Sequence, residues 1–249
     1  MDRNYVTHAF EQYVSRYDAN DPKIRLKIDH TRRVAALCER IAPSAGVERV
    51  DLAWLCGMLH DIGRFEQIKR YGTFNDAVSV DHAALGADLL FGEGLIDQFS
   101  PGLSGVEAGI LEVAIRSHSA YRIGPGLGEA EERYCHILRD ADKIDIFQVN
   151  CETPLEDIYN VTTEALHTSA VTDAVKDCFR NRTAVLRTLK KTPADYVVAH
   201  ICLVFELVYP ISMDIVKEQG YVDQMLGFES VNEDTRAWFE YMRERIGTT

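Results

Sequence analysis

The residues of this sequence that could carry chemistry are histidines and aspartates at positions where a helical pattern expects buried apolar side chains. In the segment 22–41, Leu26, His30, Val34 and Leu37 follow one another at spacings of three and four residues, which places His30 in the middle of a buried helix face. A neutral imidazole is a common ligand of divalent metals. A single inward histidine is nevertheless more often a core residue whose ring nitrogens are satisfied by neighbours.

The adjacent pair His60-Asp61 follows a second apolar helical segment and precedes Gly63. Two consecutive side chains at the end of a helix can point toward one place, and an imidazole together with a carboxylate suits a divalent cation of borderline hardness. The alternative is that Asp61 only interacts with the end of its own helix.

Further histidines lie on helix faces of the same kind. His82 falls in the first turn of a predicted helix, in line with Leu85, and His118 ends a stripe that contains Ile115. His200 also lies on an apolar stripe, and no function is assigned to it. The pattern therefore marks five inward histidines and does not by itself separate ligands from core residues.

A carboxylate occupies one more inward position. Asp142 continues the apolar stripe through Cys135 and Leu138. A buried, unpaired aspartate costs several kcal/mol or undergoes a large pKa shift. Asp142 therefore needs a cation, which either Arg139 one turn earlier or a metal ion could supply.

The elements that must position these residues are helices, because every long periodic segment repeats near 3.6 residues and no alternating strand is found. We predict an all-α fold in one domain, with a core at about residues 22–150 and a C-terminal helical extension at about 151–249. The segment Arg64–Val80 is interpreted as a long loop, and 149–160 has no clear period. The predicted helices are Tyr5–Tyr17, Pro22–Ile41, Glu48–His60, Asp81–Leu90, Ser104–Ser117, Glu129–Ala141, Thr172–Leu189, Pro193–Val208 and Val231–Ile246.

Charge and composition exclude several classes of protein. The formal net charge is −12, with 39 acidic against 27 basic residues, which argues against a stable complex with nucleic acid but not against a small anionic substrate. The chain starts without a signal-peptide pattern, and no apolar run approaches the roughly 20 residues of a membrane helix. The six cysteines are scattered without a CxxC pair, so we expect a protein of the reducing cytoplasm that does not enter a membrane. The oligomeric state is not indicated.

The order His30, His60-Asp61, Asp142 resembles the HD superfamily of metal-dependent phosphohydrolases. The surrounding residues fit as well, and the resemblance spans about residues 26–147. The matching segments are Ile28-Asp29-His30-Thr31-Arg32-Arg33-Val34, Gly57-Met58-Leu59-His60-Asp61-Ile62-Gly63-Arg64 and Leu138-Arg139-Asp140-Ala141-Asp142-Lys143-Ile144-Asp145.

The resemblance implies a helical bundle with a metal site. His30, His60, Asp61 and Asp142 would bind one ion. The segments around His82 and His118 look like those of members with a second metal, which would make these two histidines ligands of a second ion and Asp61 the bridge between the ions. The cofactor would be a divalent metal (Mn, Fe, Co, Ni, Zn or Mg), with two ions per chain.

The activity that the resemblance implies is hydrolysis of a phosphoester of a small metabolite or nucleotide, through a water molecule activated by the metal. Asp61, Arg64 and Lys143 would be catalytic. The basic residues that flank the ligand segments are candidates for binding the anionic phosphorylated substrate: Arg64, Lys143, Lys69, Arg70, Arg116 and Arg122. Two alternatives remain: a diiron oxygenase of the same superfamily that uses O₂ on a small polar substrate, and a non-catalytic nucleotide or metal sensor.

Overall fold

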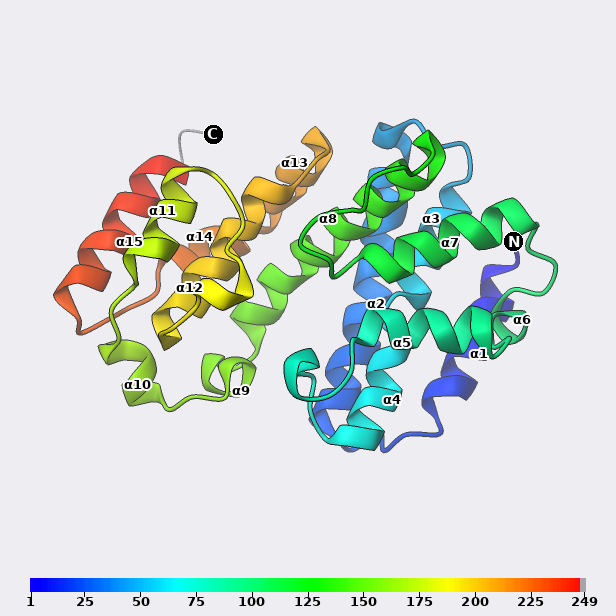
Figure 1. The fold of residues 1–249 in the computed structure, drawn as a ribbon, viewed down its shortest axis with the longest axis horizontal. Coiled ribbons are helices and arrows are strands. Elements are labelled where there is room, and N and C mark those ends of the chain that lie inside the picture. Colours follow the sequence, from blue (N-terminus) through cyan, green and yellow to red (C-terminus); the bar gives the residue numbers. More distant parts are fainter. Residues whose placement is uncertain (247–249) are drawn as a thin grey trace. The chain divides into compact units, whose positions relative to one another are not determined.

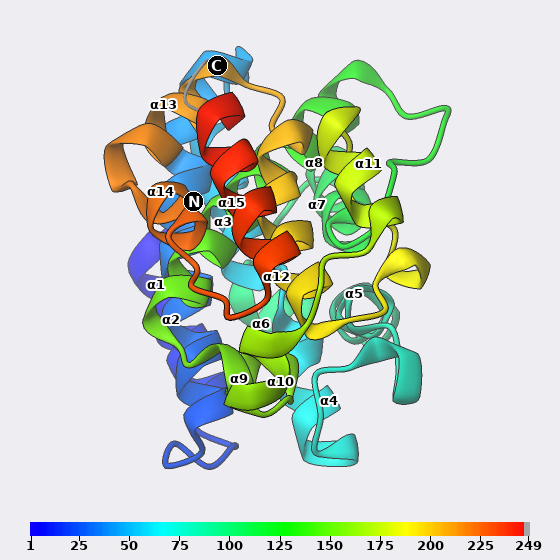
Figure 2. The same cartoon turned by 90° about the vertical axis from the view of Figure 1, so that its left-hand side faces the viewer.

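Helices account for all regular structure in the part of the chain that the structure describes. The computed structural model describes residues 1–246, which are mostly helical and contain no strand (Figures 1 and 2). The predicted all-α fold class is therefore confirmed.

The helices fall into two compact units, residues 1–142 and the chain from Lys143 onward. Whether the second unit is an extension of one domain, as predicted, stays a prediction. The first unit contains α1 (Arg3–Val14), α2 (Pro22–Ile41), α3 (Val50–Leu59), α4 (Ile62–Tyr71), α5 (His82–Ala87), α6 (Ile96–Phe99), α7 (Gly105–Ser117), the first part of α8 (Glu129–Glu152), the short 3₁₀ helices η1 (Ala42–Ala45) and η2 (Asp76–Val78), and the π-helical turn η3 (Asp88–Gly92).

The second unit begins inside α8 and contains the remaining helices. They are α9 (Leu155–Tyr159), α10 (Thr163–Thr168), α11 (Asp173–Arg180), α12 (Pro193–Ile201), α13 (Pro210–Gln219), α14 (Tyr221–Leu226) and α15 (Glu233–Ile246), with the 3₁₀ helices η4 (Arg187–Leu189) and η5 (Cys202–Glu206).

Local sequence explains where the helices of the first unit begin. Asp21 caps α2 by accepting a hydrogen bond from the backbone nitrogen of Lys23, and Pro22 occupies the first helical position. α7 starts with a capping box in which Ser104 and Glu107 each bond the backbone of the other. Both helices have the bounds predicted from sequence to within one residue.

Two close backbone contacts hold the central helices of the first unit together. α2 packs on α3, and a Cβ atom added at Gly57 would lie 2.5 Å from the Cα of Ala35. α4 packs on α5, where a Cβ at Gly63 would overlap the carbonyl oxygen of His82 and lie 2.7 Å from the backbone nitrogen of Gly86. Only glycine allows these approaches, and the second brings the segment after His60-Asp61 against the start of α5.

We therefore expect Gly63→Ala to destabilise the protein by about 3 kcal/mol, the upper end of the usual cost of overpacking, because the added methyl group meets backbone that cannot rotate away. Urea denaturation measures this. The control is Gly109→Ala in α7, where an added Cβ has no atom within 4 Å, and it should stabilise the protein by up to about 1 kcal/mol. Equal stabilities of the two variants would contradict the close packing.

The predicted loop Arg64–Val80 is wrong in its first half. Residues 62–71 form α4, which buries Ile62, Phe65 and Ile68 and ends at Gly72 in the left-handed region at φ 68°. The buried face of α4 has only one large apolar residue per turn, and charged residues lie between them. The helical spacing was therefore too weak to recognise in the sequence. The ring of Phe65 packs edge-to-face on those of α1 residues such as Phe10.

The predicted helices of the second unit were too long. α11 ends at Arg180, and Arg182 has a positive φ of 55°, so the helix predicted to Leu189 is broken there. The helix predicted to Val208 is α-helical only to Ile201 and continues as η5. In the opposite direction, α8 extends 11 residues beyond its predicted end at Ala141, to Glu152.

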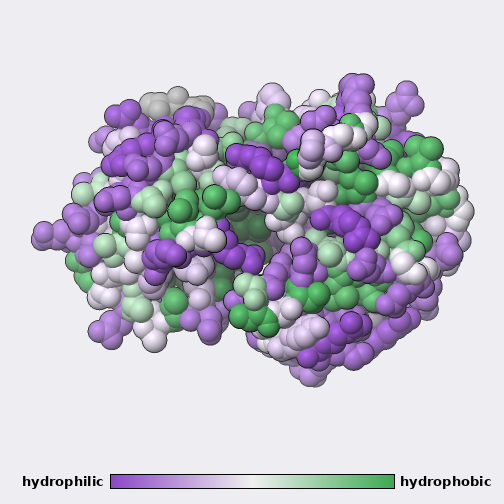
Figure 3. All heavy atoms as spheres, in the orientation of Figure 1, coloured by the Kyte–Doolittle hydropathy of each residue, from purple (hydrophilic) through white to green (hydrophobic). Residues whose placement is uncertain are grey.

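All six cysteines are free thiols, and Cys38, Cys56, Cys135 and Cys202 are buried. No helix within residues 1–246 combines the length and the apolar composition that a membrane span requires. Hydrophilic residues are spread over the face of the molecule that Figure 3 shows, with smaller hydrophobic patches between them.

Candidate metal centre

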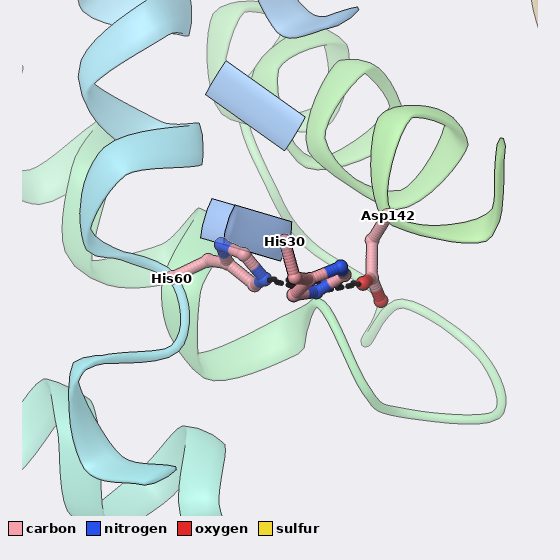
Figure 4. Close-up of side chains that lie close together, drawn as sticks. All are labelled: His30, His60 and Asp142. Atoms are coloured by element: carbon pink, nitrogen blue, oxygen red, sulfur yellow. Dashed lines mark hydrogen bonds and ion pairs between the residues drawn. The ribbon is translucent and has the colours of Figure 1, made fainter. Parts of the chain in front are cut away.

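Three side chains from three different helices meet in the first unit. His30 lies in the middle of α2, His60 directly follows α3, and Asp142 lies in α8. The Nε2 atom of His30 is 3.2 Å from that of His60 and 3.2 Å from Oδ1 of Asp142, so His30 lies between the other two (Figure 4). The two histidines are almost fully buried.

Asp61 connects this set with two further histidines. Its Oδ2 atom lies 3.5 Å from Nε2 of His30 and 3.4 Å from Nε2 of His60. Its Oδ1 atom lies 3.6 Å from Nε2 of His82 and 3.8 Å from Nε2 of His118, and these two nitrogens are 3.0 Å apart. The first donor group is therefore His30, His60, Asp142 and Oδ2 of Asp61, and the second is His82, His118 and Oδ1 of Asp61.

The separations within each donor group are close to those of ligands around one ion, and those from Oδ1 of Asp61 are slightly longer. Nitrogen and oxygen atoms that each lie about 2.1 Å from a metal are about 3.0–3.5 Å apart at octahedral or tetrahedral angles. The sets His30-His60-Asp142 and His60-Asp61-His118 both have donor atoms close enough together to hold a metal ion. Asp61 also makes no side-chain hydrogen bond to the start of α4, so its side chain does not cap that helix.

Hydrogen bonds at the far ring nitrogens fix how the imidazoles are oriented. Nδ1 of His60 is 2.8 Å from the carbonyl oxygen of Gly57, and Nδ1 of His118 is 2.7 Å from that of Ile115. A carbonyl can only accept, so each Nδ1 carries the proton and leaves the Nε2 lone pair free to bind a metal.

Burial and charge set the protonation states. Burial, followed by the nearby imidazoles of His82 and His60, lowers the pKa of His118 to about 3. Burial raises the pKa of Asp61, but Lys27 and His60 outweigh it and hold that pKa well below its usual value. Neutral histidine and ionised aspartate are the forms that bind divalent cations.

A comparison with protein families agrees with this geometry. The family model described as HD domain matches residues 28–146. The match covers just under half of the chain and supports membership of the HD superfamily. No match was found among curated proteins or solved structures. The matched range contains all six residues of the two donor groups, so the HD domain and the candidate metal centre are the same part of the chain.

A buried polar network supports the second donor group of the HD domain. Asp76, in the short helix η2, accepts from Nδ1 of His82 at 2.7 Å and from Gln67 at 2.8 Å. Gln67 is fully buried and also donates to Ser79 Oγ and to the carbonyl of Val80. The network ties the segment 74–80 to α4 and orients His82. The sequence did not predict this network, because the polar residues that form it do not recur at a helical spacing.

Arg139 holds the end of α7 in place through hydrogen bonds to backbone carbonyl oxygens. Its side chain is buried and donates from Nη1 to the carbonyl oxygens of Ser117 at 3.0 Å and His118 at 3.1 Å, and to that of Ala120. Arg139 lies one turn before Asp142 in α8. It therefore joins α8, which carries the candidate ligand Asp142, to the candidate ligand His118.

We expect Asp76→Asn to lower the affinity for an ion at the second donor group by about 10–100-fold, the usual cost of losing a carboxylate behind a metal-binding histidine. An amide would place an NH₂ group against one of the donors that Asp76 now accepts from. Metal titration followed by calorimetry measures the loss. The control is Asp81→Asn, because Asp81 caps α5 through the backbone nitrogen of Ala84 and asparagine caps equally well. An equal loss in both variants would contradict the role of Asp76.

The basic residues predicted to bind substrate lie in different places. Arg64 is 85% buried, and its Nε is 3.8 Å from Oδ1 of Asp61. Lys143 follows Asp142 directly in α8 and is buried. Arg116 pairs with Glu112 and Asp88 at the surface, and the guanidinium of Arg122 lies 4.6 Å from the centre of the exposed Tyr121 ring.

Lys69 and Arg70 pair with Glu66 and line a separate cavity of about 320 Å³. The rest of its lining comes from residues at 13–17 and from residues between Leu89 and Gln98, and it includes none of the six candidate ligands. Only Arg64 and Lys143 thus lie next to candidate ligands, in space and in sequence respectively.

The remaining inward histidine has other partners. Nδ1 of His200 lies 2.9 Å from Oδ1 of Asn150 and 3.0 Å from the hydroxyl of Tyr159, within the second unit. Sequence reasoning also missed one residue in contact with the candidate ligands: Lys27, whose Nζ is 2.6 Å from Oδ2 of Asp61. Its position three residues before His30, on the same face of α2, was the available signal.

Proposed function

We propose that the HD domain binds two divalent metal ions and hydrolyses a phosphoester of a small metabolite or nucleotide. The observation that carries the proposal is Asp61, whose two oxygens face two different pairs of histidines. A carboxylate in this position suits a bridge between two ions. His30, His60 and Asp142 would complete the ligands of the first ion, and His82 and His118 those of the second.

Bound divalent ions would supply an activated water molecule and neutralise negative charge on a phosphoryl group. Charge arithmetic supports an anionic substrate in spite of the net charge of −12. Two divalent ions add four positive charges, and Asp61 and Asp142 return two negative ones, which leaves a local charge of about +2. A chain that is acidic overall can therefore bind a phosphate at this site.

Arg64 is the side chain best placed to hold that phosphate. Its Nη1 donates to Gln67, to the carbonyl of Phe74 and to Asp76, which fixes the guanidinium plane. Its Nε is buried and makes no hydrogen bond within the described residues, although it faces Asp61. An unsatisfied buried donor is costly, and an oxygen of a bound anion would satisfy it. Lys143, beside Asp142, is proposed as a second cation for the substrate.

The experiment is to count metal ions in protein purified without added metal, record its electron paramagnetic resonance spectrum, and assay a panel of phosphoesters with Mn²⁺, Co²⁺, Ni²⁺ and Mg²⁺. Hydrolysis that is lost on chelation and restored by metal is the expected result. No hydrolysis across the panel, together with O₂ consumption by the iron-loaded form, would replace the proposal by the oxygenase alternative. Nucleotide binding without turnover of any kind would replace it by the sensor.

A further inference from the structure

One cation, Lys27, is in direct contact with a candidate metal ligand. Its Nζ lies 2.6 Å from Oδ2 of Asp61, a charge-assisted hydrogen bond in which the lysine side chain is 15% and the aspartate 2% exposed. Lys27 lies on α2, one turn before His30, and its contact reaches a residue 34 positions further along the chain.

The oxygen that Lys27 holds belongs to the first donor group. Oδ2 is the atom of Asp61 that lies within 3.5 Å of both His30 and His60. An ion bound by this group needs a lone pair of Oδ2, and an ammonium group on the same oxygen would be a few ångströms from a divalent cation. The repulsion at that distance is strong in a mostly buried site. Lys27 and the first ion therefore compete for Asp61.

A place to which Lys27 can move is also present. Its Nζ already lies 5.6 Å from the centre of the Phe74 ring, and the guanidinium of Arg64 lies 5.5 Å from the same ring. The attraction of a cation to an aromatic face does not depend on Asp61. The four-carbon stem of lysine is flexible, so Nζ can leave the carboxylate while its stem stays on α2.

We propose that Lys27 binds the anionic substrate, and that the first metal ion releases it for this task by displacing it from Asp61. In the metal-free protein Lys27 neutralises the buried carboxylate. In the loaded protein it lies beside Arg64, where the two cations contact oxygens of the substrate that the metal ions do not. The identity of the anion as a phosphoryl group rests on the proposed function, whereas the competition with metal does not.

The competition is tested by metal titration of Lys27→Met, which keeps the length of the side chain and removes its charge. The first ion should bind about 10–100-fold more tightly than in the wild type, because it no longer displaces a charge-assisted hydrogen bond. The metal-free variant should also melt at a lower temperature than the wild type, since Asp61 loses its partner. Lys27→Gln, which keeps a donor without the charge, serves if the methionine variant does not fold.

The matched control is Lys23→Met, one turn earlier on α2, where Nζ donates to the exposed carbonyl of Gly72. It should bind metal as the wild type does. Unchanged or weaker binding of the first ion by folded Lys27→Met or Lys27→Gln would overturn the competition.

Substrate binding is tested with inorganic phosphate on protein saturated with metal. Lys27→Met should bind phosphate about 10–100-fold more weakly than the wild type at equal metal content, which is the usual value of a hydrogen bond to a charged group. Equal phosphate affinity of the two proteins would overturn the role of Lys27 even if the wild type hydrolyses phosphoesters. If the variant binds phosphate more weakly and the wild type hydrolyses no phosphoester, the role of Lys27 in binding the anion is supported and the proposed function is rejected.

Discussion

Asp61→Ala should reduce phosphoester hydrolysis to below about 1% of the wild-type rate. Losing a group behind a ligand already costs about 10–100-fold, and Asp61 is a proposed direct ligand of both ions. The substitution removes both carboxylate oxygens, so each donor group loses one atom and the site loses one negative charge. The measurement is kcat/KM with a saturating concentration of the best metal from the panel, together with the metal content of the variant.

Two controls separate chemistry from folding. Asp88→Ala removes a surface carboxylate that pairs with Arg116 and is 65% exposed, and it should keep wild-type activity. Asp61→Asn keeps the size of the side chain, so it should fold as the wild type does and still lose activity. Full activity in Asp61→Ala would reject the candidate metal centre.

The second large effect concerns the number of bound ions, which should fall by different amounts when different candidate ligands are replaced. His118→Ala should keep about one ion per chain and lose the other, because the second donor group has only two histidines and a shared carboxylate. His30→Ala should deplete the ion of the first donor group and weaken binding at the second, since Asp61 would be held less firmly by an ion at Oδ2. A site of three ligands that loses one should be empty at micromolar metal.

Metal counting on the wild type and on the His30→Ala, His82→Ala and His118→Ala variants decides this. His136→Ala is the control, because His136 lies in α8 beside Glu132 and is 26% exposed, so both ions should remain. A wild type that holds one ion when fully loaded would end the two-metal proposal and the diiron alternative with it. Unchanged stoichiometry in His118→Ala would make His118 a core residue.

The sequence singled out side chains that the structure brings together, but it missed some of the elements around them. His30 and Asp142 interrupt apolar stripes in long helices, and a buried polar residue in such a stripe is a strong anomaly. The resemblance then supplied the order that separated His118 from His200. The helix α4 was missed because one apolar residue per turn is a weak period.

Contacts between polar residues that lie far apart in the sequence could not be predicted. Gln67 bonds Val80 and Lys27 bonds Asp61 across 13 and 34 positions, and nothing in local spacing selects these partners. The helices α9, α10 and α14 have five or six residues each, too few for a helical period to show.

The buried thiols offer a way to follow the metal centre without any substrate. Each of three helices associated with the first donor group carries one: Cys38 on α2, Cys56 on α3 and Cys135 on α8, and burial raises the pKa of Cys135 to about 11. A protonated, inaccessible thiol reacts with a disulfide reagent only when its helix opens, so the labelling rate of the native protein reports the free energy of that opening. An ion that joins the three helices must slow the labelling of all three thiols together, by a factor that grows with its concentration relative to Kd.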